Sequence, residues 1–491
     1  MKKSFKLIKL LLFVALFSTN AIFATGKINP AVLEKTKKAI VTINTRVAIS
    51  AYINPGSWTG TGFVTDKENG FIVTNNHVIG PASVGTYFVT FHNGQQVEAK
   101  LAYYDLWQDY AVLKIDKSEI PSSVEQIVFS KESAATNQSV LVVSNTEGQD
   151  FSFHTGYVSG MYEINGDMPQ CSYVINLNLT GGASGSPIMN DKNEAIGVLY
   201  GGGKTYVFAL KGQYVQKAID GLKSNKSPTR QHIGVISELY SLDKAVKHRN
   251  FPKKEMQEFL KNFPDARNRV VSIQNVLTGS PAEKAIKSGD IIWEIDGKPL
   301  GGNLEIFDNG MDNAAKNTVK LTIYRDGKRL EQDVALYDIN NNKVKRMINF
   351  AGATFFESDD YTSAKSGIPL NALSIANVQV GSSFSVLPTG FFYQDRTLYR
   401  LFIRSIGQYN TSNLDDIVKN IPNIIKQKFV TIKFRNHSPY FHAFNSTLIS
   451  SHDDMQADIV FDSIDTKPRA LKYDYKTMEW ITEDIILDNE N

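Results

Sequence analysis

Short apolar runs separated by turns fill the chain between residues 39 and 210. Clear examples are residues 40–43 and the two runs 62–65 and 71–74, which flank an Asn-Gly turn. Asn-Gly is typical of two-residue hairpin turns, and short β-rich runs at intervals of about 8–12 residues are typical of barrels and sandwiches. The pattern predicts a mainly β domain with antiparallel pairing.

A change of pattern follows this β-rich part. Apolar residues recur at helical spacing over 211–223, and the polar stretch 224–228, which ends in proline, breaks the helix and marks a domain boundary. Residues 232–340 mix strands with helices. Residues 348–436 repeat a similar order of elements, which indicates a weak internal duplication.

The composition is that of a folded protein with several domains. The chain has 491 residues, of which 42% are hydrophobic, and its 34 Gly and 16 Pro are too few for a collagen-like or low-complexity chain. Four of the 53 basic residues lie in the first ten positions, so 53 − 4 = 49 bases face 50 acids in the rest. No basic field remains to attract phosphates, and we expect no nucleic-acid partner.

The first 24 residues carry an export pattern. Four lysines precede the apolar run 10–17, and the stretch ends in the small residue Ala24. A basic start, a short apolar core and a small residue at the cleavage site are typical of a secretory signal peptide. We expect a signal peptide at 1–24, a periplasmic protein and no stable membrane span after cleavage. An uncleaved anchor helix is the alternative, although the run is shorter than the ~20 residues of a bilayer span.

Cysteine and histidine usage bears on metals and disulfides. Cys171 is the single cysteine, and the eight histidines are scattered with no HExxH motif. One cysteine allows no intrachain disulfide, and structural or catalytic zinc needs closely spaced Cys and His ligands. The sequence therefore predicts no metal site and no cofactor.

Three local patterns carry candidate chemistry. His77 follows an apolar strand, Asp109 precedes another, and Ser184 lies in the glycine-rich turn 181–187. Taken alone, His77 fits a packed residue and Asp109 an ordinary turn residue. Together they occur in the order His, Asp, Ser, which is the order of a nucleophile, base and orienting acid on chymotrypsin-type double barrels. The three predict the catalytic triad His77, Asp109 and Ser184.

Five linked motifs resemble the HtrA/Deg family of periplasmic serine proteases. The resemblance covers roughly residues 30–340 and rests on the segments 60–64, 72–78, 109–114, 156–160 and 182–187. It implies a chymotrypsin-like fold of two six-stranded barrels, with the triad in the cleft between them. It also implies ATP-independent cleavage of unfolded or misfolded exported proteins, and a homo-oligomer built from trimers.

The serine loop departs from the family pattern at two positions. Ala183 stands where the family usually has Asn, and Ser186 replaces a common Gly. Neither change removes a triad side chain. The resemblance implies an oxyanion hole made by the backbone amides of Gly182 and Ser184.

Residues shortly before the serine should line the S1 pocket. They are Leu177, Leu179 and Thr180, and none of them is an acid that would pair with a basic substrate side chain. The sequence therefore predicts a small or medium aliphatic P1 residue.

A second resemblance begins after the predicted boundary. The Ile-Gly-Val tripeptide and the Ser-Pro-Ala to Gly-Asp-Ile-Ile to Asp-Gly run within 279–297 resemble a PDZ domain. Such a domain binds a peptide C-terminus as an added strand, and the amides of Ile233, Gly234 and Val235 would hold its carboxylate. An insert at 236–269 carries apolar residues at helical spacing, which fit a packed helix or a subunit contact: Met256, Phe259, Leu260 and Phe263.

The sequence thus predicts a mainly β chain of several parts. They are a signal peptide (1–24), a trypsin-like serine protease domain (25–227), a PDZ domain (232–340), a degenerate PDZ-like domain (348–436) and an extension without a predicted fold (437–491). The expected function is an exported serine endopeptidase for protein quality control, whose partners are unfolded polypeptides and their C-termini. The alternative is a proteolytically weak PDZ-containing chaperone or peptide-binding protein.

Overall fold

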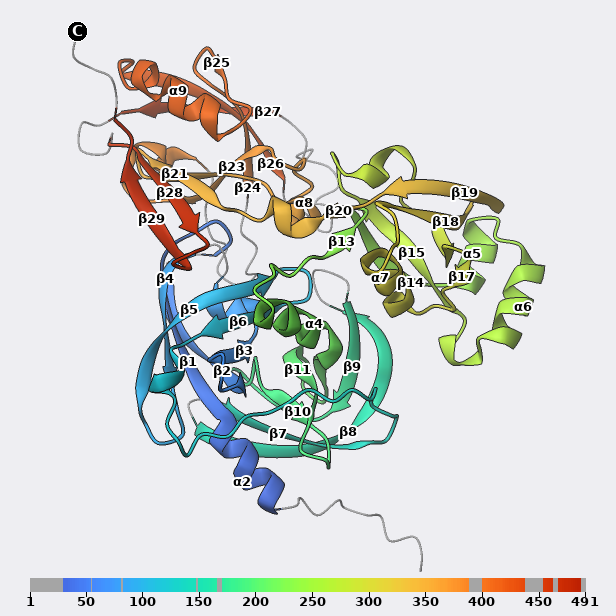
Figure 1. Cartoon of the computed structure of the whole chain (residues 1–491). Coiled ribbons are helices and arrows are strands. Elements are labelled where there is room, and N and C mark those ends of the chain that lie inside the picture. Colours follow the sequence, from blue (N-terminus) through green and yellow to red (C-terminus); the bar gives the residue numbers. More distant parts are fainter. Residues whose placement is uncertain are drawn as a thin grey trace, which may run out of the picture.

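The computed structural model describes residues 30–53, 55–80, 83–146, 149–165, 170–387, 400–437, 454–461 and 467–486. The predicted signal peptide lies outside these residues. Three bodies of β structure follow one another along the described chain (Figure 1). The first is a pair of closed barrels, the second is a PDZ sheet, and the third is a large C-terminal sheet.

The first barrel follows helix α2 (Pro30–Ala39), closes in the strand order β1-β2-β3-β6-β5-β4, and has antiparallel pairs throughout. The one-turn helix α3 (Asn76–Ile79) follows its third strand directly. Its strands are β1 (Ile40–Ser50), β2 (Gly56–Asp66), β3 (Phe71–Thr74), β4 (Ser83–Thr90), β5 (Gln96–Asp105) and β6 (Tyr110–Lys114).

The second barrel closes in the order β10-β11-β12-β9-β8-β7 and is followed by helix α4 (Gly212–Lys223). Apolar side chains of both barrels share one core, in which the rings of Phe63 and Phe129 meet edge to face at 5.8 Å. The fold confirms the predicted double barrel. The strands are β7 (Ser139–Thr146), β8 (Gln149–Asn165), β9 (Gln170–Asn176), β10 (Pro187–Met189), β11 (Ala195–Gly202) and β12 (Val207–Lys211).

The PDZ sheet has the strand order β14-β15-β16-β18-β19, so β14 is an edge strand. Helix α7 (Leu304–Asp312) contributes Phe307 to the core beneath this sheet. The strands are β14 (Val235–Ser241), β15 (Arg269–Val276), β16 (Ile291–Ile295) with its partner β17 (Lys298–Pro299), β18 (Thr318–Arg325) and β19 (Lys328–Ala335), and a separate pair joins β13 (Gln231–His232) to β20 (Tyr337–Asp338).

The predicted insert forms helices α5 (Leu242–His248) and α6 (Lys253–Asn262) on one side of the PDZ sheet. Met256 and Phe259 of α6 are buried in a cluster that includes Phe251 and Tyr324. This packing confirms the interpretation of the insert as a packed helix. Leu260 is exposed, and a subunit contact through this face stays a prediction.

The C-terminal body is one antiparallel sheet of nine strands, and helix α9 (Leu414–Ile424) packs its apolar side chains into the core of this sheet. Helix α8 (Asp360–Ser366) lies between β22 and β23 in the chain. The described parts of 437–491 belong to this sheet, because β27 pairs with β26 at one end and β28 with β21 at the other. The main path is β27 (Asp454–Val460), β26 (Phe429–His437), β24 (Arg400–Ile406), β23 (Leu373–Val378), β22 (Ala353–Glu357), β21 (Arg346–Phe350), β28 (Arg469–Asp474) and β29 (Glu479–Asp484), with β25 (Tyr409–Asn410) beside β24.

The C-terminal sheet packs on the loop that follows β1 of the first barrel. Tyr52 of this loop is buried among Phe356 and Met347, and its hydroxyl donates to Asp359. The side-chain amide of Asn377 donates to the Ser50 carbonyl at 2.7 Å. These contacts anchor the short loop against another part of the chain.

The PDZ body meets the protease domain through charged side chains of α7. Glu305 pairs with Lys211 (2.6 Å between Oε2 and Nζ), and Asp312 pairs with Lys217 (3.0 Å). The Tyr214 hydroxyl donates to Asp308 at 3.3 Å. Acidic residues on successive turns of α7 therefore face basic and hydroxyl groups of the protease domain.

The carboxyl group of Asp308 makes this contact sensitive to pH. Burial raises its pKa to about 7, and the Asp312 and Glu305 carboxylates add to the rise while Arg230 opposes it. Between about pH 4 and 7 the folded protein therefore holds a proton that the unfolded chain has released, so stability falls as the pH rises through this window.

Asp308→Asn removes the buried carboxylate. We expect the thermal unfolding midpoint to rise by several degrees at pH 8, since each kcal/mol moves the midpoint by about 2–4 °C in a domain of 150–250 residues. At pH 4 we expect little change, because the proton that Asp308 holds in the folded protein is then still partly bound in the unfolded chain. Calorimetry at both pH values checks this, with the exposed Asp333→Asn as a control. An equal shift at both pH values would contradict the assignment.

Candidate active site

His77 and Asp109 meet at one end of the first barrel. Strand β3 pairs with β6 so that Thr74 lies opposite Ala111. Because the pair is antiparallel, residues that follow β3 and residues that precede β6 lie at the same edge. His77 Nδ1 is 2.7 Å from Asp109 Oδ2, and the His77 backbone N–H donates to Asp109 Oδ1 at 2.9 Å. Asp109 therefore binds both the ring and the backbone of His77.

The backbone of Asp109 is itself fixed in an uncommon conformation. Its φ angle is +49°, in the left-handed region that Asp and Asn adopt more readily than most residues. The side chain of Asn75 donates to the Asp109 carbonyl at 2.8 Å and holds this conformation. His77 and Asp109 keep 45% and 23% of their side-chain surface exposed, so the pair is open to a substrate.

The loop of Ser184 is fastened to the first barrel by Thr61. The Thr61 N–H donates to the Ser184 carbonyl at 3.0 Å, and its hydroxyl donates to the Gly182 carbonyl at 2.7 Å. Thr61 also accepts at its carbonyl from the Thr74 hydroxyl (2.7 Å), three residues before His77. The chain therefore brings the serine loop beside the strand end that carries the histidine.

The glycine after the serine is required by this close approach. Gly185 has a φ of +89°, and a Cβ placed there would lie 2.0 Å from the Thr61 carbonyl oxygen. No other residue fits without moving the loop from the barrel. Within the described residues, the hydroxyl of Ser184 makes no hydrogen bond, and neither do the amide N–H groups of Gly182 and Ser184. Those amides are available to an oxyanion, as the predicted oxyanion hole requires.

The two unusual residues of the loop have structural roles. The Ser186 hydroxyl donates to the Ala183 carbonyl at 2.6 Å, which closes the turn around Ser184. Ala183 is buried against the second-barrel core. Both residues therefore stabilise the loop and leave the nucleophile in place.

The residues predicted for the S1 pocket lie on the chain that leads into this loop. Leu177 is buried in the second-barrel core, Leu179 packs against the same cluster, and Thr180 is exposed. Their role in the pocket stays a prediction, which a peptide library checks. We expect dominant cleavage after small or medium aliphatic residues, because a basic side chain would be desolvated there without a partner. Dominant cleavage after Lys or Arg would contradict it.

The predicted carboxylate loop of the PDZ domain lies at the start of β14. Gly234 has a φ of +86° and lies so close to Ser280 that a Cβ would clash with it at 2.2 Å. The Gly234 N–H donates to Nδ1 of His232 at 3.0 Å, and burial lowers the pKa of His232 to about 3, which keeps the ring neutral. Ile233 and Val235 are buried. Binding of a terminal carboxylate by these residues stays a prediction.

Several residues of the site gave no sequence signal of their own. Thr61 and Asn75 occur inside the motifs but are not distinguished by residue type. Asn145 of the second barrel donates its backbone N–H to the Thr61 hydroxyl (3.0 Å) and its side-chain amide to the Val41 carbonyl (3.2 Å). These polar groups join the two barrels behind the serine loop, and only their long-range partners reveal their role.

The described residues also bear on membrane spans and metal sites. None of the helices described there is both long and apolar enough to cross a membrane. The same residues contain no group of three or more His, Cys, Asp or Glu placed to hold a metal ion.

The aspartate Asp109 binds His77, and the loop of Ser184 lies beside them where the two closed barrels meet. This arrangement is the active site of a trypsin-like serine endopeptidase. Residues 60–198 match the trypsin-like peptidase domain family, and residues 253–336 match the PDZ domain family. The chain therefore combines a trypsin-like peptidase domain with a PDZ domain, in the order that the sequence predicted.

Two relatives match different lengths of the chain. The chain is 58% identical over 191 residues to the uncharacterized protein RP187 of Rickettsia prowazekii (strain Madrid E). The match covers 39% of this chain and 98% of that protein, so this chain belongs to the same family as RP187. It is 28% identical over 402 residues to the pro-apoptotic serine protease NMA111 of Meyerozyma guilliermondii, over 79% of this chain and 39% of that protein. The chain thus spans about two fifths of the fungal relative.

Two solved structures resemble parts of the chain. One is the serine endoprotease from Yersinia pestis, with 20% identity and a TM-score of 0.43 over 63% of this chain and 97% of that chain. The other is the HtrA-type protease AlgW with a tripeptide, with 17% identity and a TM-score of 0.48 over 63% of this chain and 96% of that chain.

Proposed function

We propose that this protein is an exported serine endopeptidase that degrades unfolded or misfolded proteins without ATP. The observation that carries the proposal is the 2.7 Å contact between His77 Nδ1 and Asp109 Oδ2 beside the fastened loop of Ser184. In this contact the ring donates from Nδ1, which leaves Nε2 as the base.

The reaction proceeds as two displacements. His77 takes the proton of the Ser184 hydroxyl as Oγ attacks the scissile carbonyl, and the amides of Gly182 and Ser184 bind the developing oxyanion. The C–N bond breaks when His77 gives that proton to the leaving amine. Water then repeats the sequence on the acyl-enzyme, releasing the acid and restoring Ser184. Asp109 stabilises the imidazolium formed in both steps.

The resting loop already satisfies most of these requirements. The Ser184 hydroxyl has no hydrogen bond within the described residues, and catalytic hydrogen bonds are often loose before a substrate binds. The reaction begins when Oγ comes within hydrogen-bond distance of His77 Nε2. Substrate binding in the cleft brings the two atoms together in the proposed mechanism.

An unfolded chain is the substrate class that suits this domain arrangement. A protease cleft binds an extended segment, which folded proteins rarely present. The edge strand β14 offers backbone groups to which a second extended segment, such as a C-terminus, can add. We further propose a homo-oligomer built from trimers and, from the pattern of residues 1–24, a periplasmic location.

The test compares a destabilised protein with its folded form. Purified protein should digest casein or a reduced, unfolded substrate without ATP and leave the folded form intact, whereas Ser184→Ala should digest neither. Suppression of aggregation by both forms without any cleavage would favour the alternative, a peptide-binding chaperone. Release of a mature chain that begins near residue 25 into the periplasmic fraction would support export, and an intact chain in the membrane fraction would contradict it.

A further inference from the structure

The catalytic Asp109 ends a short turn that begins at Asp105. Asp105 Oδ1 accepts hydrogen bonds from the backbone N–H groups of Trp107 and Gln108, both at 2.9 Å. Asp105 therefore fixes the shape of the turn that delivers Asp109 to His77. Of these two carboxylates, Asp109 is the one that contacts the histidine.

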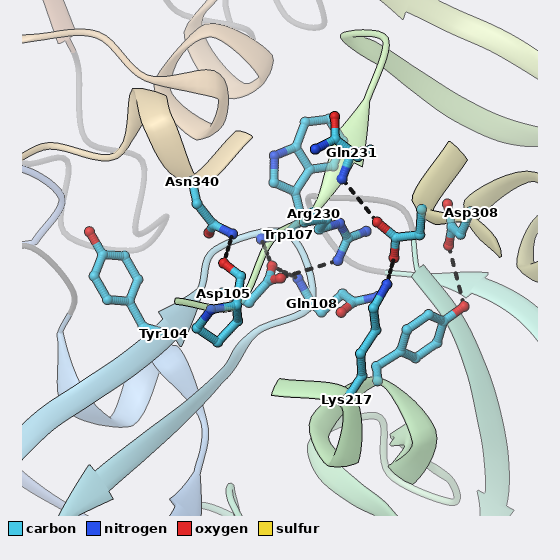
Figure 2. A network of polar contacts seen from close by, with 12 residues as sticks. Tyr104, Asp105, Trp107, Gln108, Lys217, Arg230, Gln231, Asp308 and Asn340 are labelled. Atoms are coloured by element: carbon cyan, nitrogen blue, oxygen red, sulfur yellow. Dashed lines mark hydrogen bonds and ion pairs between the residues drawn. The ribbon is translucent and has the colours of Figure 1, made fainter. Parts of the chain in front are cut away.

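The other oxygen of Asp105 binds a residue outside the protease domain core. Arg230 Nη1 lies 3.3 Å from Asp105 Oδ2, and the two side chains are only 8% and 2% exposed (Figure 2). Arg230 belongs to the linker between α4 and β13. Its backbone is held at both ends, because its N–H donates to Asp338 (3.0 Å) and its carbonyl accepts from Ile339 (3.0 Å). The Arg230 guanidinium is therefore held in place and pairs with Asp105 at the start of the turn.

Packing on this side of the turn is incomplete. A cavity of about 210 Å³ lies beside the ion pair and is lined by Asp105, Gln108 and Arg230, among others. Because of this cavity, fewer side chains pack against the turn on the side that faces Arg230. One ring contact supplements the ion pair: Trp107 packs on His232 with 4.5 Å between ring centroids. Leu106 and Trp107 of the turn are buried in apolar clusters, and the ion pair with Arg230 holds the Asp105 carboxylate at the start of the turn.

We propose that Arg230 is a positioning residue of the protease. Through Asp105 it holds the turn in the place from which Asp109 contacts His77. The inference rests on the proposed catalytic reaction and adds to it a requirement for the linker. A shift of about 1 Å in a catalytic group can lower turnover by about a hundredfold, so loss of this brace should appear mainly in kcat.

The substitutions are Arg230→Met, Arg230→Lys and the double variant Asp105→Asn with Arg230→Met. Arg230→Met leaves a buried carboxylate unpaired and lowers stability, which alone would not identify a positioning role. The double variant removes that unpaired charge while leaving the turn untied. The matched control is Lys217→Met, which breaks an ion pair to Asp312 in the same region (Figure 2) without touching the turn.

The measurements are kcat and KM for a short peptide and the rate of labelling by a fluorophosphonate, at a temperature where circular dichroism shows each variant folded. We expect Arg230→Met and the double variant to lose about 10- to 100-fold in kcat and in labelling rate, with KM within about twofold of the wild type. Arg230→Lys should recover part of the loss, and Lys217→Met should match the wild type.

Wild-type kcat in folded Arg230→Met would overturn the positioning role. So would recovery of kcat in the double variant, because the effect would then come from the unpaired charge. If Arg230→Met does not fold, the double variant decides between these results. Absence of cleavage and labelling in the wild type itself would instead refute the proposed function.

Discussion

Ser184→Ala is expected to lower kcat for peptide cleavage by about a million-fold, which is the scale seen when a serine nucleophile is removed. The substitution removes the attacking oxygen but leaves the backbone of the loop, which Thr61 and Leu199 hold through hydrogen bonds to Ser184 and Gly185. The fold should therefore be unchanged. The measurement is turnover of a short peptide, together with the thermal unfolding midpoint.

The control for this prediction is the exposed Ser159→Ala, which removes a hydroxyl from β8 away from the loop. It should retain full activity. His77→Ala should be about as damaging as Ser184→Ala, and the double variant little worse than either, because the triad acts as a unit. Digestion by Ser184→Ala at the wild-type rate would show that another nucleophile acts.

Asp109→Asn is expected to lower kcat by about 10⁴-fold with little change in KM. An asparagine amide in this position can donate a hydrogen bond to Nδ1, which favours the tautomer whose Nε2 is protonated and unable to act as a base. The loss should be much larger than that of any change at Arg230. Turnover measurements across substrate concentrations separate kcat from KM.

Asp105→Asn is the matched comparison for this carboxylate. It keeps an oxygen that can accept from Trp107 and Gln108 and removes only the charge facing Arg230, so its effect should stay below about a hundredfold. A damaging Asp105→Asn with a silent Asp109→Asn would mean that the two carboxylates have been assigned the wrong way round.

The parts of the fold that the sequence predicts are those encoded by local signals. The Asn-Gly turn at 69–70, the short apolar strands and the glycines around Ser184 each act within a few residues, and together they predicted a mainly β domain and the triad. The two barrels were implied by the resemblance to the HtrA/Deg family, and the structure has them. The helical insert followed from the spacing of Met256 and Phe259 for the same reason. Local periodicity was sufficient because each of these elements buries one face of a short segment.

Long-range pairing could not be predicted in this way. Strand β28 pairs with β21 although more than a hundred residues separate them. Neither segment carries a sequence pattern that indicates the strand with which it pairs. The extension therefore gave no fold signal from sequence, although its described strands complete the C-terminal sheet. Register between distant strands depends on the tertiary packing of both faces.

The polar groups that support the site were missed for a similar reason. Arg230 has the appearance of an ordinary charged linker residue, and its partner Asp105 is 125 positions away. The pair can hold the turn because both side chains are buried, and burial is a property of the folded chain. Thr61 likewise gains its role only when the second barrel brings Asn145 to its hydroxyl.

The central claim is that Ser184 is a nucleophile activated by His77, and covalent labelling tests it most directly. Wild-type protein would be incubated with a fluorophosphonate and its mass measured, followed by peptide mapping of the modified residue. We predict one adduct per chain, on Ser184, and none in Ser184→Ala or His77→Ala. Absence of an adduct on the wild type, or an adduct on any other serine that persists in Ser184→Ala, would contradict the account.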